Sequence, residues 1–249
     1  AIAFEPGLPP AQTMALSLGH LGASIKVWAK VAGVKVGVLA TGGGESAKAG
    51  EVWRSTLASL PAKADLLPVP MVAPSPNGQV QIIELDVPQS VVQFGAAGIA
   101  RKDKDYMAAF VMNQVLGGGG FSSRLTEEVR EKRGLAYSVY SYLQPFRHTA
   151  LFAGGVATKN EEVGRSLDVI RAELTRMATD GLTAKELADA KSYLTGSYAL
   201  RFDTSARIAS QLLGILMEDL GIDYVDRRNG EIESVTLDDV KRVAARLLK

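Results

Sequence analysis

Runs of apolar and β-branched residues predict strands in the first two thirds of the chain. Such runs, bounded by glycine, proline or polar residues, are typical of strands. They occur at residues 33–40, 79–87, 90–98, 135–144 and 149–158. A short link near His148 joins the last two, which favours an antiparallel pair.

The remaining periodicity predicts helices. An apolar stripe from about residue 103 to 116 is typical of an amphipathic helix, and weaker helical patterns lie at 11–21 and 46–60. A hydroxyl three residues before an acid is the signature of a capping box, and it occurs at Thr158–Glu161, Thr183–Glu186 and Thr236–Asp239. Asp203 or Thr204 marks a fourth helix start.

Strands followed by helices predict the fold class. Grouped strands without alternating helices argue for α+β, with a mostly antiparallel sheet covered on one face by helices. We expect residues 33–249 to form this domain, and residues 1–32 carry no assignment.

Four consecutive glycines, Gly117, Gly118, Gly119 and Gly120, follow the predicted helix. A phosphate loop needs a preceding strand and a following lysine, and this run has neither. Two interpretations stay open: a tight corner between helices, or a loop whose bare backbone lets an extended peptide approach. Ser122 or Ser123 would begin the next helix, and Gly134 would end it in the left-handed conformation.

Composition excludes several classes of partner and site. The 28 Lys and Arg residues balance 27 Asp and Glu residues, so no net charge attracts nucleic acid or an anionic membrane. No apolar run reaches the roughly 18 residues of a membrane span, and the first residues lack a signal-peptide pattern. Cysteine is absent, and His20 and His148 are far apart. We therefore expect no zinc site in this chain alone, because such sites normally use three protein ligands.

The segment GGGGFSSRLTEEVREKRGLAYSV resembles the second-domain signature of the pitrilysin/insulinase-type zinc metallopeptidases, the inverzincins. DVPQSVVQFGAAGIARKDKDYMAAFVMNQVLGG upstream and GLTAKELADAKSYLTGSYALRFDT downstream are similar to the same domain. The resemblance runs from about Val80 to the C-terminus, and more weakly from Gly33. This combined pattern is far more specific than a lone glycine motif.

The resemblance implies the non-metal half of a two-domain enzyme. In this family, homologous α+β halves pair across a cavity, and one half carries the zinc motif H-x-x-E-H, which is absent here. Zinc is then expected on a homologous domain or subunit, with a peptide as substrate. The chain would be a C-terminal fragment or a truncated subunit, inactive alone, with a periplasmic location favoured over a cytoplasmic one. Apolar surface that normally meets the partner would allow self-association. The alternative is an inactive scaffold or a peptide-binding subunit of the same fold.

The family's second domain contributes an arginine and a tyrosine seven residues apart, which match Arg130 and Tyr137. The resemblance implies that both donate to the substrate carbonyl oxygen as negative charge develops there. It also favours Gly117 to Gly120 as a substrate-binding loop. Without it, Arg130 is an exposed cation at a helix end and Tyr137 a half-buried strand residue.

Other candidates have structural interpretations. Arg133 is offset on the helix, and Arg124 would need an acidic partner such as Glu127 or Glu128. Asp103 and Asp105 would start a helix, kept solvated and ionised by nearby lysines. Tyr193 and Tyr198 would take core and boundary positions in a helix, and His148 would occupy a turn.

Overall fold

The computed structural model describes residues 78–249 without a break, residues 68–75, strand residues 3–6, 24–31 and 34–41, and residues 51, 55 and 58. The helix expected at 11–21 and His20 lie outside these residues, as does the helix at 46–60 apart from three positions. The chain divides into two compact units. One comprises Ala1–Pro68 with Thr195–Arg228, and the other Val69–Leu194 with Asn229–Lys249.

The first unit contains a three-stranded antiparallel sheet in the order β1-β3-β2. Its elements are β1 (Ala3–Pro6), β2 (Ser24–Val31), β3 (Val34–Thr41), the short helix η5 (Ala199–Phe202) and α5 (Ser205–Met217). β3 confirms the strand expected at 33–40. Thr204 caps α5, because its side chain accepts a hydrogen bond from the Arg207 N–H. This confirms the fourth helix start.

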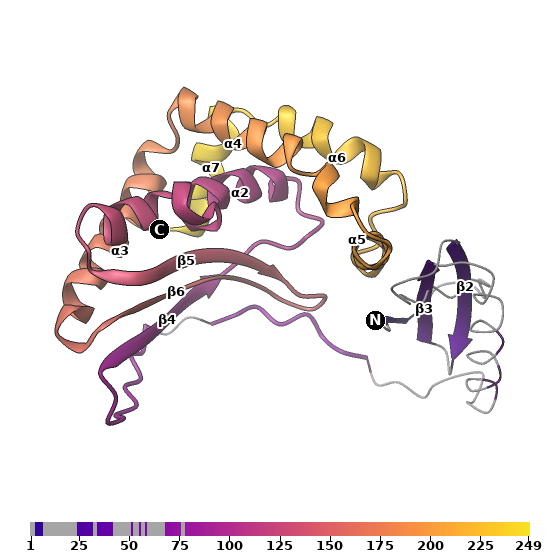
Figure 1. Ribbon diagram of the computed structural model, residues 1–249, viewed down its shortest axis with the longest axis horizontal. Helices are drawn as coiled ribbons and strands as arrows, with labels where there is room; N and C mark the ends of the chain where they lie inside the picture. Colours follow the sequence, from indigo (N-terminus) through magenta and orange to yellow (C-terminus); the bar gives the residue numbers. More distant parts are fainter. Residues whose placement is uncertain are drawn as a thin grey trace. The chain divides into compact units, whose positions relative to one another are not determined.

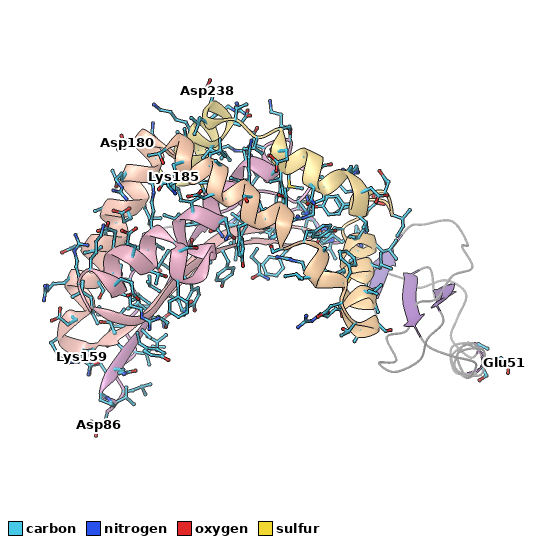
Figure 2. The ribbon with its side chains drawn as sticks, turned by 45° about the horizontal axis from the view of Figure 1, so that its top comes forward. Glu51, Asp86, Lys159, Asp180, Lys185 and Asp238 are labelled. Carbon is cyan, nitrogen blue, oxygen red and sulfur yellow. The ribbon has the colours of Figure 1, made fainter. Side chains whose placement is uncertain are left out.

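The second unit is built on a three-stranded antiparallel sheet in the order β4-β6-β5. Its strands are β4 (Gln89–Ala97), β5 (Ala136–Pro145) and β6 (Ala150–Lys159). They confirm the strands expected at 90–98, 135–144 and 149–158, including the antiparallel β5–β6 pair. Gln89 pairs with Lys159, and Figure 2 shows Lys159 and Asp86 at the same end of this sheet.

Helices cover one face of the β4-β6-β5 sheet (Figure 1). The helices of this unit are α2 (Tyr106–Asn113), η1 (Gln114–Gly118), η2 (Gly120–Ser122), η3 (Thr126–Glu131), η4 (Asn160–Glu162), α3 (Val163–Asp180), α4 (Ala184–Gly196) and α7 (Leu237–Leu247). A further helix, α6 (Tyr224–Glu233), begins in the first unit and ends in the second. The α+β class with one covered sheet face is confirmed.

The core lies between the covered sheet face and the helices. Val139 and Val156 face each other across β5 and β6, and both are buried. Met112, Leu116 and Leu125 pack in the same cluster and are fully enclosed. Truncating one such side chain to alanine typically costs about 2–5 kcal/mol. The opposite face carries exposed side chains, including Tyr140 and Tyr142.

The strand expected at 79–87 is wrong. The segment has no ladder partner among the described residues, and Ile82, Ile83 and Leu85 are all exposed. Strand composition reflects how well side chains suit a pleated, half-buried surface. In the described part of the chain, the side chains of residues 79–87 pack on no such surface.

Two of the three capping boxes are confirmed. Thr236 and Asp239 exchange both bonds of the motif at the start of α7, and Thr183 and Glu186 do so before α4. Thr158 is a correction, because it lies inside β6 and its hydroxyl donates to the Leu135 carbonyl at 2.5 Å. A sequence pattern of hydroxyl and acid cannot distinguish a strand end from a helix start.

The glycine run is also built differently from the expected loop. The predicted helix from 103 to 116 begins at Tyr106 and continues past Leu116 as a wider π-helical turn that includes Gly117 and Gly118. Ser123 does cap the next helix, since the Thr126 N–H donates to its Oγ at 3.4 Å. That helix is also mostly of the π type, a form often found near functional sites.

Candidate active site

Arg130 and Tyr137 lie next to each other. Arg130 is in η3, Tyr137 is the second residue of β5, and the guanidinium carbon is 5.4 Å from the phenol ring centroid. Gly134 reverses the chain between them at φ 61°, as predicted. Its N–H donates to the Arg130 carbonyl, and the Leu135 N–H donates to the Val129 carbonyl. These bonds occupy the end of the helix and leave the Arg130 side chain free to turn toward β5.

A β-bulge turns Tyr137 to the open face of the sheet. Ala136 pairs with Thr158 while Ser138 pairs with Ala157, so Tyr137 is an extra residue in the β5 ladder. Regular alternation would place Tyr137 on the same face as Val139, which is buried. With the bulge, 79% of Tyr137 is exposed. Bulges re-aim side chains in this way beside active sites.

Thr158 holds the strand opposite the bulge, a role that its sequence pattern did not indicate. Its hydroxyl donates to the Leu135 carbonyl and accepts a bond from Ser166 Oγ at 3.3 Å. Both hydroxyl side chains are buried. These two hydrogen bonds join Leu135, just before the bulge, to β6 and α3. They therefore fix the position of the backbone from which Tyr137 projects.

The cations around Arg130 have carboxylate partners. Lys132 and Arg133 both bind Glu128, at 2.7 and 2.6 Å, and the hydrogen bonds from these two residues lower the pKa of Glu128 despite its partial burial. By contrast, Arg130 forms a long ion pair with exposed Glu131, with 3.5 Å between Nε and Oε1. Such a pair contributes little. Among the described cations of this segment, Arg130 therefore has the longest and weakest carboxylate contact.

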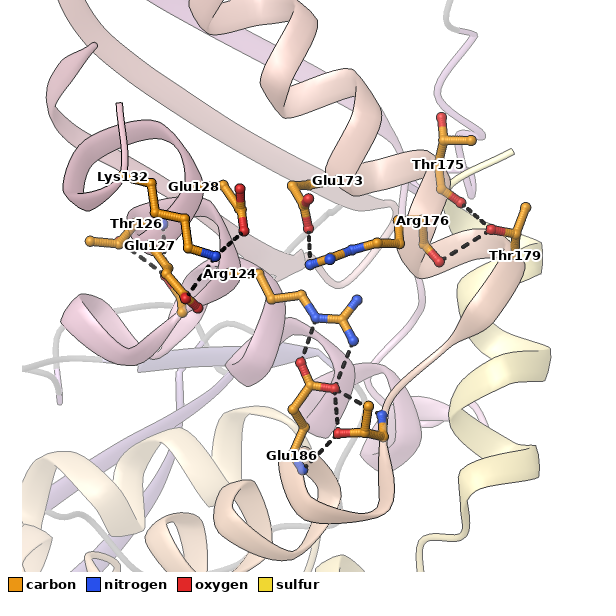
Figure 3. Close-up of polar contacts among 12 residues, drawn as sticks. Arg124, Thr126, Glu127, Glu128, Lys132, Glu173, Thr175, Arg176, Thr179 and Glu186 are labelled. Carbon is orange, nitrogen blue, oxygen red and sulfur yellow. Dashed lines mark hydrogen bonds and ion pairs between the residues drawn. The ribbon is translucent and has the colours of Figure 1, made fainter. Parts of the chain in front are cut away.

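Arg124 has a buried structural role, shown in Figure 3. The expected partners Glu127 and Glu128 are wrong, because Arg124 makes two bonds to Glu186 at 2.6 and 2.7 Å and one to the Gly181 carbonyl. Burial alone would raise the pKa of Glu186. Hydrogen bonds from Arg124 and Thr183 outweigh it, and this pKa falls to about 2. The pair ties the helix that carries Arg130 to the first turn of α4.

The four glycines occupy different surroundings. Gly117 is buried, and a side chain there would collide with the backbone and hydroxyl of Ser141 on β5. Gly118 and Gly120 are exposed, and Gly120 has φ 59° with open space around it. Gly117 thus permits close packing of η1 on β5, whereas Gly118 and Gly120 present backbone to solvent.

Asp103 and Asp105 anchor α7, which corrects the expected solvated lysine environment. Asp105 is buried and binds Arg242 at 2.7 Å, and Asp103 binds Arg246 at 2.8 Å. The Arg246 hydrogen bond is the main cause that lowers the pKa of Asp103. The sequence order gave no sign of these partners, which lie more than 130 positions away along the chain.

The remaining candidates do not form a site. His148 lies in the bend of the β5–β6 hairpin, as expected. Tyr193 is exposed, and Tyr198 is buried but lies beyond the end of α4, so their expected shared helix is wrong. No group of three histidine, aspartate or glutamate side chains among the described residues could hold a metal ion.

Comparison with known proteins identifies the family. Residues 38–194 match the family described as "Peptidase M16 inactive domain". The chain therefore belongs to this family, and the resemblance to zinc metallopeptidases is confirmed.

Individual relatives agree with this assignment. The chain is 38% identical to an uncharacterized zinc protease of Streptomyces coelicolor, over 69% of this chain and 37% of that protein. It is 30% identical to a protein named a non-peptidase homolog in Helicobacter pylori, over 64% of this chain and 37% of that protein. A solved peptidase M16 inactive domain from Pseudomonas fluorescens matches with a TM-score of 0.72 and 31% identity, covering 88% of this chain and 51% of that one.

The chain spans well under half the length of these curated relatives. None of the helices in its described part is long and apolar enough to cross a membrane.

Proposed function

We propose that this chain is the non-metal half of a zinc metalloendopeptidase and supplies substrate binding and transition-state stabilisation. The adjacency of a half-buried guanidinium and an exposed phenol, Arg130 and Tyr137, carries the proposal. Neither residue belongs to the hydrophobic core, and the β-bulge at Tyr137 turns the phenol toward solvent. Both residue types are donors suited to an oxygen that gains negative charge.

The metal does not fit this chain. The sequence has two histidines far apart and no cysteine, and the described residues hold no group of three metal-type ligands. We therefore place zinc and the general base on a homologous domain or subunit. In that assembly, Tyr137 and Arg130 would donate hydrogen bonds to the carbonyl oxygen of the peptide bond under attack.

The glycine run supplies the path for the peptide in this proposal. Gly118 and Gly120 offer backbone without side chains at the surface. An extended peptide could approach them closely. Gly117 takes no part in this contact, because it is buried against Ser141.

Replacing Tyr137 tests the catalytic assignment. In the chain assembled with a partner that carries H-x-x-E-H, Tyr137→Phe should lower turnover of a quenched fluorescent peptide by about 10- to 1,000-fold, the scale for loss of one oxyanion donor. Tyr193→Phe is the matched control, since this exposed tyrosine lies on α4. Unchanged turnover in Tyr137→Phe would exclude the assignment.

The alternative is an inactive scaffold or a peptide-binding subunit, which the name of the Helicobacter pylori relative favours. The same assay separates these functions. A scaffold neither cuts nor binds the peptide in the assembly, and a binding subunit retains the peptide without cutting it. Either result with a zinc-loaded partner would replace the peptidase proposal.

A further inference from the structure

Phe121 is an exposed aromatic residue beside the candidate site. It follows Gly120 in the short helix η2, and 74% of the residue is exposed. Its exposure is not a by-product of a loose loop. Ser122 Oγ donates to the Gly119 carbonyl at 3.0 Å, and Ser123 Oγ donates to the Gly120 carbonyl at 2.9 Å. Two hydroxyl bonds and the left-handed Gly120 therefore fix the turn that presents the ring.

The ring of Phe121 contacts the same guanidinium as the phenol of Tyr137. The Arg130 guanidinium carbon lies 4.8 Å from the Phe121 ring centroid and 5.4 Å from the Tyr137 ring centroid. Both distances lie within the range of cation–π attraction. An aromatic side chain from the glycine turn and one from the start of β5 thus both contact the guanidinium of Arg130.

Two rings are a suitable support for a guanidinium that must bind a ligand. A carboxylate would occupy the N–H donors, as Glu186 does with Arg124. Rings attract the cation through their faces and leave its in-plane N–H groups available to an incoming oxygen. The long, exposed Glu131 pair does not hold Arg130 in one place.

We infer that Phe121 is a positioning residue that holds the Arg130 guanidinium beside Tyr137. The catalytic consequence of this inference rests on the proposed function, whereas the geometric part does not. The glycine run then has a second purpose beyond passage of a peptide. Gly120 supplies the backbone conformation that places Phe121 over Arg130.

The geometric part is tested on the chain alone. Phe121→Leu keeps an apolar side chain and removes the ring, so the Arg130 Nε–H resonance should move in ¹H–¹⁵N spectra as the ring current disappears. Arg130→Lys assigns that resonance by its loss, and Phe146→Leu is the control, because this exposed ring lies at the β5–β6 hairpin. A resonance that moves no more in Phe121→Leu than in the control would overturn the inference.

The catalytic part is tested in the assembled enzyme. Phe121→Leu should lower kcat about two- to fivefold with KM unchanged, the effect expected from one exposed cation–π contact, and Phe121→Trp should restore it. A rise in KM that depends on the peptide side chain, with kcat unchanged, would instead make Phe121 a substrate contact and overturn the positioning role. If the wild-type assembly does not cut at all, the proposed function fails, and the spectra alone decide the inference.

Discussion

Individual glycines show how one residue type serves different physical needs. Gly117 is required because a neighbouring strand occupies the space of a side chain, and Gly120 because its backbone is left-handed. Sequence alone identifies the run as unusual. It cannot assign these separate reasons, because they depend on Ser141 and on a local φ angle that only the fold reveals.

Alanine substitutions distinguish the two glycines. Gly117→Ala should lower the free energy of unfolding by about 1–3 kcal/mol through overpacking against β5. Gly120→Ala should lower it by about 1–2 kcal/mol through backbone strain. Gly164→Ala, in an open position of α3, is the control and should be neutral or stabilising by up to about 1 kcal/mol. Urea unfolding measures all three, and a neutral Gly117→Ala would contradict the packing role.

At the scale of elements, local signals are predictable and pairings are not. The sequence indicates β3, β4, β5 and β6 and the caps at Thr183, Thr204 and Thr236 because each depends on neighbouring residues. Residues 79–87 have strand composition but pair with no described strand. Thr158 has the sequence pattern of a helix cap but lies within β6. The bulge at Tyr137 depends on registration against β6, so the sequence predicts which residue matters without showing how it reaches the surface.

The ion pair between Arg124, two residues before η3, and Glu186 of α4 should give the stability of the second unit an acid dependence. The folded pKa of Glu186 is about 2 against an ordinary value of 4.5. Its stabilisation is therefore present above about pH 4.5 and is lost as pH falls through about 2. The shift corresponds to at most about 3 kcal/mol, and to less after screening, since 28% of the side chain is exposed.

Urea unfolding across this pH range checks the ion pair. Glu186→Gln should be less stable than the wild type at pH 7, and the difference should shrink as pH falls from 4.5 toward 2. Asp189→Asn is the control, because its partner Lys185 lies on the exposed face of the same helix. A difference for Glu186→Gln that is constant with pH would contradict the assignment.

At the scale of the whole molecule, the chain belongs to the peptidase M16 inactive domain family, and its described residues hold no group of three metal-type ligands. Helices cover one face of the β4-β6-β5 sheet (Figure 1). The tyrosines of β5 are exposed on the other face. Family resemblance predicts the fold, and the absence of H-x-x-E-H is seen in the sequence itself. The resemblance does not predict that Phe121 joins the site, because that contact arises from the turn of the glycine run.

Metal should have no effect on the isolated chain. Because its described residues hold no cluster of three metal-type ligands, EDTA and added zinc should leave its Tm unchanged. Differential scanning calorimetry measures this, with a zinc-binding partner domain as the positive control. A rise in Tm on addition of zinc would show that the chain binds zinc, and would contradict the prediction.

The bulge makes the interval between Gly134 and Ser138 sensitive to length. Loss of one residue there would restore a regular ladder, in which the position directly before Ser138 pairs with Thr158 and faces the helices. A homologous chain could therefore retain both an arginine and a tyrosine and still hide the hydroxyl in its interior. For this fold, the count of residues between the two side chains carries as much functional information as their identities.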